Sequence, residues 1–304
     1  MKPPSPLRHG LPIPFLKPGM RVRIVAPSSP FNAADLQRGL ELLSSRYEVS
    51  HNPSLFERHG YLAGTDARRL EELQSAIDDP EVAAIIAARG GYGATRLLDA
   101  LDLEPLRRSP KLLVGFSDIT ALHAVWSQRG LGSLHGPMVA AVGRGTDAQL
   151  SRVIEALEGR YARELTGLRA LVPGRARGPL LGGNLAVLCS LLGTPFMPDL
   201  DGAVLLLEDV GERPYRIDRM LTSLRQSGAL ARLAGILLGA FTKAEAGSDG
   251  MTVEDVLLDR LGDLGIPVLS GAPVGHIDDN EPVPLGAVIE LDSAAGTARF
   301  GASQ

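Results

Sequence analysis

The chain has 304 residues, with 31 Lys or Arg against 35 Asp or Glu, and a formal net charge of −4. This length allows two domains, each with its own core. The charge balance lacks the basic excess of a nucleic-acid-binding protein, and no run of about 18 apolar residues indicates a transmembrane helix. We therefore expect neither nucleic acid nor a membrane as a partner.

The N-terminal residues 1–19 are rich in proline and lack the apolar core of a signal peptide. We interpret them as a flexible arm and expect a cytoplasmic protein. The single cysteine, Cys189, has apolar neighbours, which favours a buried structural thiol. The six histidines are not spaced as zinc ligands, so we expect no metal and no cofactor.

Strands and helices alternate over residues 20–166. Strands are predicted at 21–26, 47–50, 82–88, 112–115 and 132–137. Helices are predicted at 32–46, 65–79, 94–101, 118–129 and 149–157, with Asn32 and Thr65 or Asp66 as caps. This order predicts an α/β, Rossmann-like domain with a parallel sheet and helices on both faces.

A glycine loop, Arg89-Gly-Gly-Tyr-Gly93, follows the predicted strand 82–88. It matches neither the dinucleotide-binding fingerprint nor the P-loop, which would carry a lysine. One interpretation is close approach of the backbone to a ligand, with N–H groups available as donors. The other is a tight turn that needs positive φ. The residues alone favour neither.

Ser117 lies where the strand 112–115 turns into a helix. Such a turn can present a serine as the nucleophile of an elbow, but Ile119 stands where the usual elbow has its second glycine. On this stretch alone, a helix cap at Ser117 or Asp118 is the favoured interpretation, because caps are far commoner. His135 could be a base, although a hydrogen-bonded histidine near the sheet is favoured.

A second, smaller and mixed α/β domain is predicted from residue 184 to residue 304. Residues 167–183 are rich in Gly, Arg and Pro and are interpreted as the linker. Strands are predicted at 203–208, 235–241 and 266–269, with a final hairpin of 288–291 and 297–300. Helices are predicted at 184–192, around 217–224 and at 253–261.

Three polar residues stand at or beyond the ends of apolar strands: Ser117, Glu208 and His276. A serine becomes a good nucleophile when a base takes its proton and a third group orients that base. Ser, Glu and His supply these roles in the chain order of hydrolases with a nucleophile elbow. Other acids compete with Glu208 for the third role: Asp118, Asp278, Asp279 and Glu281.

The sequence resembles the LD-carboxypeptidase family of serine peptidases, the muramoyltetrapeptide carboxypeptidases. The resemblance runs from about Leu16 to the C-terminus. It is carried by the segments 17–19, 25–30, 88–93, 115–120, 135–137, 181–185, 207–219 and 275–276. Together these segments are specific, whereas each alone is not.

The resemblance implies Ser117 as nucleophile, His276 as general base and acid, and Glu208 as the residue that orients His276. It implies an oxyanion hole formed by the backbone N–H groups of Gly91 and Asp118, in a groove between the two domains. Candidates for contacts with the substrate are Arg89, Gly90, Tyr92 and Arg213, and Arg216 is a further candidate for its terminal carboxylate.

The implied reaction removes the terminal D-alanine from a muropeptide tetrapeptide, in peptidoglycan recycling in the cytoplasm. The family also suggests a homodimer. One alternative is the related microcin C immunity peptidases, which cut an acyl-nucleotide toxin and stack a tryptophan on its base. The only tryptophan here, Trp126, is interpreted as a core residue, which favours the cell-wall branch. A non-catalytic small-molecule binding protein is the other alternative.

Overall fold

The computed structural model describes residues 10–248 and 250–301. Its chain divides into two compact units. The N-terminal unit consists of residues 13–161 and 281–284, and the C-terminal unit takes the other described residues. Among the described residues, no helix has both the length and the apolar character needed to cross a membrane.

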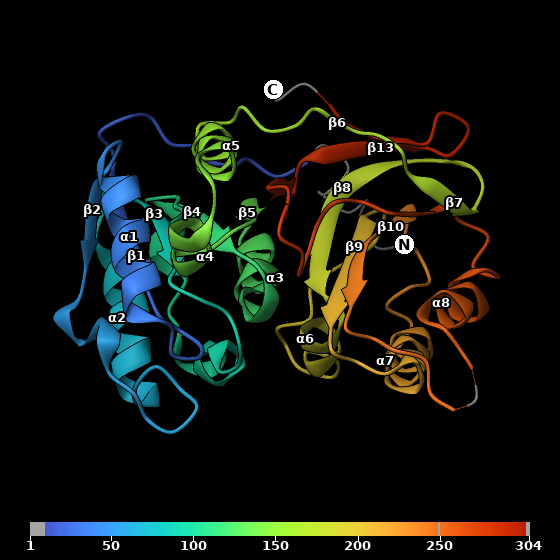
Figure 1. Ribbon diagram of the computed structural model, residues 1–304, viewed down its shortest axis with the longest axis horizontal. Helices are drawn as coiled ribbons and strands as arrows, with labels where there is room; N and C mark the ends of the chain where they lie inside the picture. The colour runs from blue at the N-terminus through green and yellow to red at the C-terminus, as the bar shows by residue number, and fades with distance from the viewer. Residues whose placement is uncertain (1–9, 249, 302–304) are drawn as a thin grey trace. The chain divides into compact units, whose positions relative to one another are not determined.

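The N-terminal unit contains a six-stranded sheet with the order β12-β5-β4-β3-β1-β2 (Figure 1). Its strands are β1 (Arg21–Val25), β2 (Glu48–His51), β3 (Val82–Ala87), β4 (Leu112–Gly115), β5 (Ser133–His135) and β12 (Val283–Leu285). The pairs from β2 through β1, β3 and β4 to β5 are all parallel. This confirms the predicted parallel sheet. The carboxyl ends of its strands therefore meet at one edge, where ligands bind in such folds.

Helices pack against this sheet in two groups. The α-helices are α1 (Ala33–Ser44), α2 (Asp66–Asp78), α3 (Thr120–Gln128), α4 (Val139–Arg144) and α5 (Asp147–Leu157). The 3₁₀ helices are η2 (Pro53–Phe56), η3 (Ala94–Ala100), η4 (Glu104–Arg107) and η5 (Ser117–Ile119). Helix α1 packs on α4, whereas α2 and α3 both pack on η3.

Local sequence explains where the helices of this unit begin. The predicted caps are confirmed: the Asn32 side chain accepts from Ala34 N and Asp35 N, and the Thr65 hydroxyl accepts from Arg68 N. Trp126 is fully buried and donates from Nε1 to the Lys111 carbonyl at 3.2 Å. It is therefore a core residue, as predicted.

The C-terminal unit contains an eight-stranded mixed sheet with the order β6-β14-β13-β8-β9-β10-β11-β7. Its strands are β6 (Glu164–Leu165), β7 (Arg169–Val172), β8 (Arg175–Asn184), β9 (Val204–Val210), β10 (Gly235–Thr242), β11 (Val268–Ser270), β13 (Val288–Asp292) and β14 (Thr297–Phe300). The central strands from β8 to β11 are parallel. β13 pairs antiparallel with both β8 and β14, which confirms the predicted final hairpin.

One core joins this sheet to the helices α6 (Leu185–Ser190), α7 (Pro214–Gln226) and α8 (Val253–Leu261). Alternate residues of β9, Leu205 and Leu207, belong to this core together with the buried stripe of α7. Side chains two apart on a strand share one face of the sheet, so the packing follows from the strand period. Because β9 and β10 pair in parallel, the carboxyl end of β9, which carries Glu208, lies beside the end of β10.

Two expectations about chain organisation differ from the structure. Residues 167–183, expected to link the domains, form β7 and most of β8. Gly178 is needed inside β8 because a Cβ there would overlap the Gly202 carbonyl oxygen, so its glycine marks close packing rather than a loop. The C-terminal unit is correspondingly larger than the expected 184–304.

The expected flexible arm is held in place over the part that the structure describes, residues 10–19. Leu11 N donates to the Gly286 carbonyl at 2.8 Å, within the C-terminal unit. Leu16 is buried and its N–H donates to the Leu157 carbonyl at 2.7 Å, within the N-terminal unit. Residues 1–9 of the expected arm lie outside the described residues.

Candidate active site

Ser117 occupies a strained position at the carboxyl end of β4. Its φ is 64°, in the left-handed region that residues other than glycine rarely adopt. Such a conformation costs about 1–3 kcal/mol and persists only where the surrounding structure enforces it. The predicted turn from strand to helix is therefore present, with the backbone strain of a nucleophile elbow.

The favoured alternative, a helix cap at Ser117 or Asp118, is wrong. The residue preceding η5 is Phe116 and the residue preceding α3 is Ile119, and neither helix has a side-chain cap. The side chain of Asp118 instead accepts a hydrogen bond at the first residue of another helix, η3, from Ala94 N at 2.8 Å. The reason is tertiary: the β4 turn and the glycine loop lie side by side.

The glycine loop lies directly against Ser117. A Cβ on Gly90 would be 3.0 Å from Ser117 Cβ and 3.3 Å from Ser117 Oγ. Gly91 and Gly93 have φ values of 114° and 135°. The tight turn with positive φ is therefore confirmed, whereas the approach of its backbone to a ligand stays a prediction.

Two further loop contacts involve sequence-predicted residues. Arg89 donates to the Pro30 carbonyl at 2.6 Å, which joins the glycine loop to the loop after β1. Tyr92 is half exposed and its ring lies 5.9 Å from that of Tyr61, while its N–H donates to Ser29 Oγ at 3.2 Å.

His135 is fully buried, which fits a structural histidine rather than a base. Its ring packs against those of Phe116 and His123. His123 bridges β4 and β5, with Nδ1 2.8 Å from Ser133 Oγ and Nε2 2.9 Å from the Gly115 carbonyl oxygen. Burial lowers the pKa of His123 to about 4, so this histidine is neutral and supports the strand that ends at the elbow.

Glu208 and His276 form a pair in the C-terminal unit. Glu208 is completely buried at the end of β9, and its Oε2 lies 2.7 Å from Nδ1 of the partly exposed His276. A proton on Nδ1 that is donated to the carboxylate leaves Nε2 as the basic nitrogen of the ring. Among the competing acids, Glu208 is the one whose contact with His276 is established.

Three residues without a predicted role hold this pair. Asn184 Nδ2 donates to Glu208 Oε1 at 3.3 Å. Asn280 Oδ1 accepts from Gly275 N at 2.8 Å, and Thr242 Oγ1 donates to the His276 carbonyl at 3.2 Å. Asn184 belongs to the segment 181–185, one of those that carry the family resemblance, and this could have marked it as a candidate site residue. Asn280, four residues after His276, and Thr242 had no such signal, and only the fold brings Thr242 to the histidine loop.

The predicted site residues are divided between the two units. One of them, Arg213, immediately precedes the first residue of α7. Ser117, Asp118 and the glycine loop belong to the N-terminal unit, and Glu208, His276 and Arg213 belong to the C-terminal unit. Within the N-terminal unit the glycine loop lies against Ser117, and within the C-terminal unit Glu208 lies against His276. The meeting of Ser117 with His276 is part of the functional proposal below.

A strained serine at a strand-to-helix turn and a histidine held by a buried carboxylate are the components of hydrolases that use an activated serine. A family model of the LD-carboxypeptidase N-terminal domain matches residues 22–136, and one of the LD-carboxypeptidase C-terminal domain matches residues 177–291. The chain belongs to the LD-carboxypeptidase family, as its sequence motifs indicated.

Individual relatives agree with this assignment. A Synechocystis protein that is 45% identical over 95% of this chain and 96% of its own length is named as a carboxypeptidase of unproven activity. The murein tetrapeptide carboxypeptidase of Pseudomonas aeruginosa is 33% identical, covering 90% of this chain and 93% of its own. The crystal structure of a muramoyltetrapeptide carboxypeptidase from Oxalobacter formigenes superimposes with a TM-score of 0.81 at 34% identity, over 92% of this chain and 98% of that chain.

The same fold occurs in a more distant protein. MccF in complex with glutamyl sulfamoyl guanosine superimposes with a TM-score of 0.86 at 21% identity, over 98% of this chain and 99% of that chain. At this identity the likeness establishes a shared fold.

Proposed function

We propose that this protein is a serine LD-carboxypeptidase that uses Ser117, His276 and Glu208. The observation that carries the proposal is the 2.7 Å contact between the buried Glu208 carboxylate and His276 Nδ1. A carboxylate in this position holds the imidazole in one tautomer and stabilises the imidazolium that forms when the ring takes a proton. Its partner in the proposal is the strained Ser117.

In the proposed reaction, Nε2 of His276 takes the Ser117 proton as Oγ attacks the scissile carbonyl carbon. The backbone N–H groups of Gly91 and Asp118 donate to the resulting oxyanion. His276 then gives its proton to the leaving amine of D-alanine, and the acyl group remains on Ser117. Water, deprotonated by His276, hydrolyses this ester and restores the enzyme.

The proposed substrate is a muropeptide tetrapeptide whose terminal D-alanine follows an L-centre diamino acid. The names of the Pseudomonas and Oxalobacter relatives support this class. Arg89, Arg213 and Arg216 are the proposed partners of the terminal carboxylate, because a guanidinium can bind a carboxylate with two parallel hydrogen bonds. We place the activity in peptidoglycan recycling in the cytoplasm and propose a homodimer, both from the family resemblance.

The test compares a tetrapeptide ending in L-diamino acid–D-Ala with a pentapeptide ending in D-Ala–D-Ala. We expect D-alanine to be released from the tetrapeptide and about 10²-fold more slowly from the pentapeptide, because one extra residue displaces the scissile carbonyl. Equal rates on the two peptides would contradict the LD specificity.

The control is Ser117→Ala, which should lose about 10³-fold or more in kcat while keeping its fold. A fluorophosphonate probe should label the wild type at Ser117 and leave this variant unlabelled. A wild type that is not labelled would favour the non-catalytic binding protein. Cleavage of an aspartyl-adenylate amide with no release from the tetrapeptide would favour the immunity-peptidase activity.

A further inference from the structure

A buried arginine joins the two loops that surround Ser117. Arg69, on α2, is completely buried, and its Nη1 donates to the Pro27 carbonyl and, at 2.9 Å, to the Gly93 carbonyl. Pro27 lies in the loop after β1, and Gly93 ends the glycine loop after β3. A single guanidinium nitrogen therefore donates hydrogen bonds to both loops and links them to each other.

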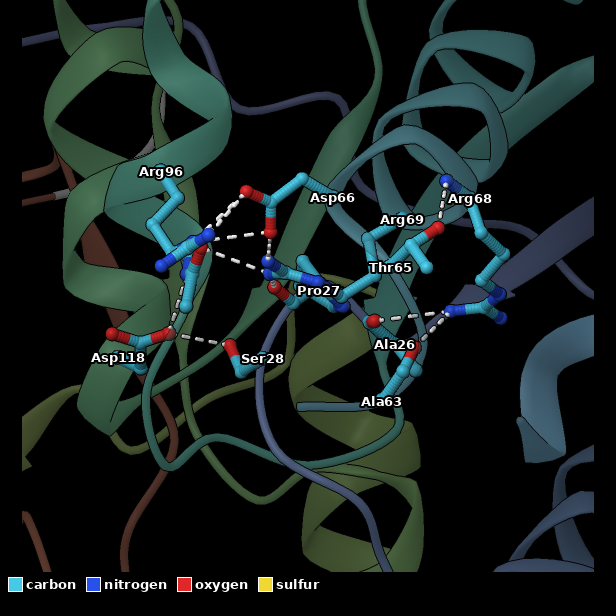
Figure 2. Close-up of polar contacts among 12 residues, drawn as sticks. Ala26, Pro27, Ser28, Ala63, Thr65, Asp66, Arg68, Arg69, Arg96 and Asp118 are labelled. Carbon is cyan, nitrogen blue, oxygen red and sulfur yellow. Dashed lines mark hydrogen bonds and ion pairs between the residues drawn. The ribbon is translucent and has the colours of Figure 1, made fainter. Parts of the chain in front are cut away.

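The Asp118 carboxylate makes a second connection between the same loops (Figure 2). It is buried, and its Oδ2 accepts from Ser28 Oγ at 2.6 Å and from Ala94 N at 2.8 Å. Ser28 belongs to the loop after β1, and Ala94 directly follows the glycine loop. Because Asp118 is the residue after Ser117, these contacts connect both loops to the nucleophile turn itself.

Charged side chains surround these two connections. The Arg69 guanidinium also pairs with Asp66, which accepts a bidentate contact from Arg96 (Figure 2). Burial raises the pKa of Asp118, while the bonds from Ser28 and Ala94 oppose this rise. The single oxygen of an Asn side chain could accept both bonds, but without the charge these bonds are weaker, and a turned amide would present its NH₂ group to both donors.

The glycine loop is closely packed, so its position is sensitive to the contacts made by Arg69 and Asp118. A Cβ on Gly93 would be 2.6 Å from Arg69 Nη1, and a Cβ on Gly90 would be 3.3 Å from Ser117 Oγ. The loop thus has Arg69 at one end and the nucleophile at the other. A small displacement of the loop changes the distance between its N–H groups and the atoms bound to Ser117.

We infer that the side chains of Asp118 and Arg69 are positioning residues that hold the glycine loop, and with it the Gly91 N–H donor, against the Ser117 turn. The inference rests on the proposed function for the role of Gly91. It assigns the side chain of Asp118 a task separate from that of its backbone N–H. Neither side chain contacts the reacting atoms, so their effect is on the placement of the transition state and not on substrate affinity.

The experiment measures kcat, KM, the rate of fluorophosphonate labelling of Ser117 and Tm for Asp118→Asn and Ser28→Ala. We expect kcat and the labelling rate to fall together, by about 10²-fold for Asp118→Asn and about 10-fold for Ser28→Ala, with KM within about threefold of wild type. Ser28→Ala removes one bond from the Asp118 carboxyl group and leaves that side chain itself unchanged, so it tests the inference even where Asp118→Asn fails to fold.

The matched control is Glu158→Gln. Glu158 is also a well-buried carboxylate of this unit, paired with Arg46 at 2.7 Å and Arg160 at 2.8 Å, and it belongs to neither loop. This variant should lower Tm while keeping kcat and labelling unchanged. Folded Asp118 and Ser28 variants with wild-type kcat and labelling, or with a change in KM alone, would overturn the inference. Failure of the wild type to cleave the tetrapeptide would instead count against the proposed function, because labelling reports on the Ser117 site without that substrate.

Discussion

The carboxylate of Glu208 and the ring of His276 are 68 residues apart in the chain, and their Oε2 and Nδ1 atoms lie 2.7 Å apart. Gly275 makes this contact possible. Its φ is 120°, and a Cβ there would be 2.7 Å from Glu208 Oε2 and 2.9 Å from Glu208 Cβ. The residue before the histidine must therefore lack a side chain for the ring to reach the buried acid.

Replacing the acid with its amide tests the pair directly. Glu208→Gln retains the size of the side chain and an oxygen that can accept from Nδ1, but it removes the charge that stabilises the imidazolium. We expect kcat to fall by about 10²–10⁴-fold, with KM changed by less than about threefold and Tm close to wild type. Steady-state kinetics on the tetrapeptide measure this split. A kcat within threefold of wild type would show that another group supports the base.

Gly275→Ala should disable the histidine loop. The variant combines strain at positive φ, about 1–2 kcal/mol, with the overlap against Glu208. We expect loss of most of kcat together with a lower Tm. Gly271→Ala is the matched control, because Gly271 has a φ of 92° with open space around it. The control should lose similar backbone stability but retain kcat. Equal kcat in the two variants would contradict the packing argument.

Gly90→Ala tests the approach of the glycine loop to the nucleophile. The new methyl group would be 3.0 Å from Ser117 Cβ and 3.3 Å from both Ser117 Oγ and the Phe116 carbonyl oxygen. These distances require a shift of a few tenths of an ångström, so we expect kcat and fluorophosphonate labelling to fall about 10-fold or more. Gly301→Ala, whose nearest contact would be an ordinary 3.6 Å, serves as the control and should behave as wild type. Unchanged labelling of Gly90→Ala would show that the loop can move away without consequence.

Asp209, next to Glu208, should make stability depend on pH. Burial raises the pKa of its carboxyl group to about 6, although Ala186 N and Val210 N donate to it at 2.9 Å and 2.7 Å. The folded protein therefore binds this proton more tightly than the unfolded chain, whose pKa is about 3.9. The contribution to stability is complete below about pH 4 and is lost as pH rises through about 6.

Asp209→Asn should remove this dependence. Urea unfolding at several values between pH 4 and pH 7 should show the stability difference shifting in favour of the variant as pH rises, by on the order of 2–3 kcal/mol. Asp263→Asn is the control, because the hydrogen bond from Arg225 lowers the pKa of Asp263 and places its window below this range. Its difference from wild type should stay constant. A constant difference for Asp209→Asn as well would mean that Asp209 is ionised throughout.

Much of the N-terminal unit could be predicted from local sequence. Short apolar runs alternating with helical periods indicated a parallel sheet, and Asn32 and Thr65 marked helix starts, because caps depend on neighbouring backbone groups only. Strand β8 was missed for the opposite reason. Its glycines suggested a loop, but Gly178 lies inside the strand because the backbone of Gly202 leaves no room for a Cβ.

The sequence by itself determined which residue types were available for the chemistry and placed Ser117 at the end of β4 and Glu208 near the end of β9. It could not choose between Ser117 as a cap and as a nucleophile, because the left-handed φ of 64° depends on loops far away in the chain. Nor could residue spacing choose Glu208 from among several acids. What the tertiary structure adds is a set of contacts: it buries Glu208, brings it to His276 across a glycine and holds both with buried amides, because strands distant in the chain meet there.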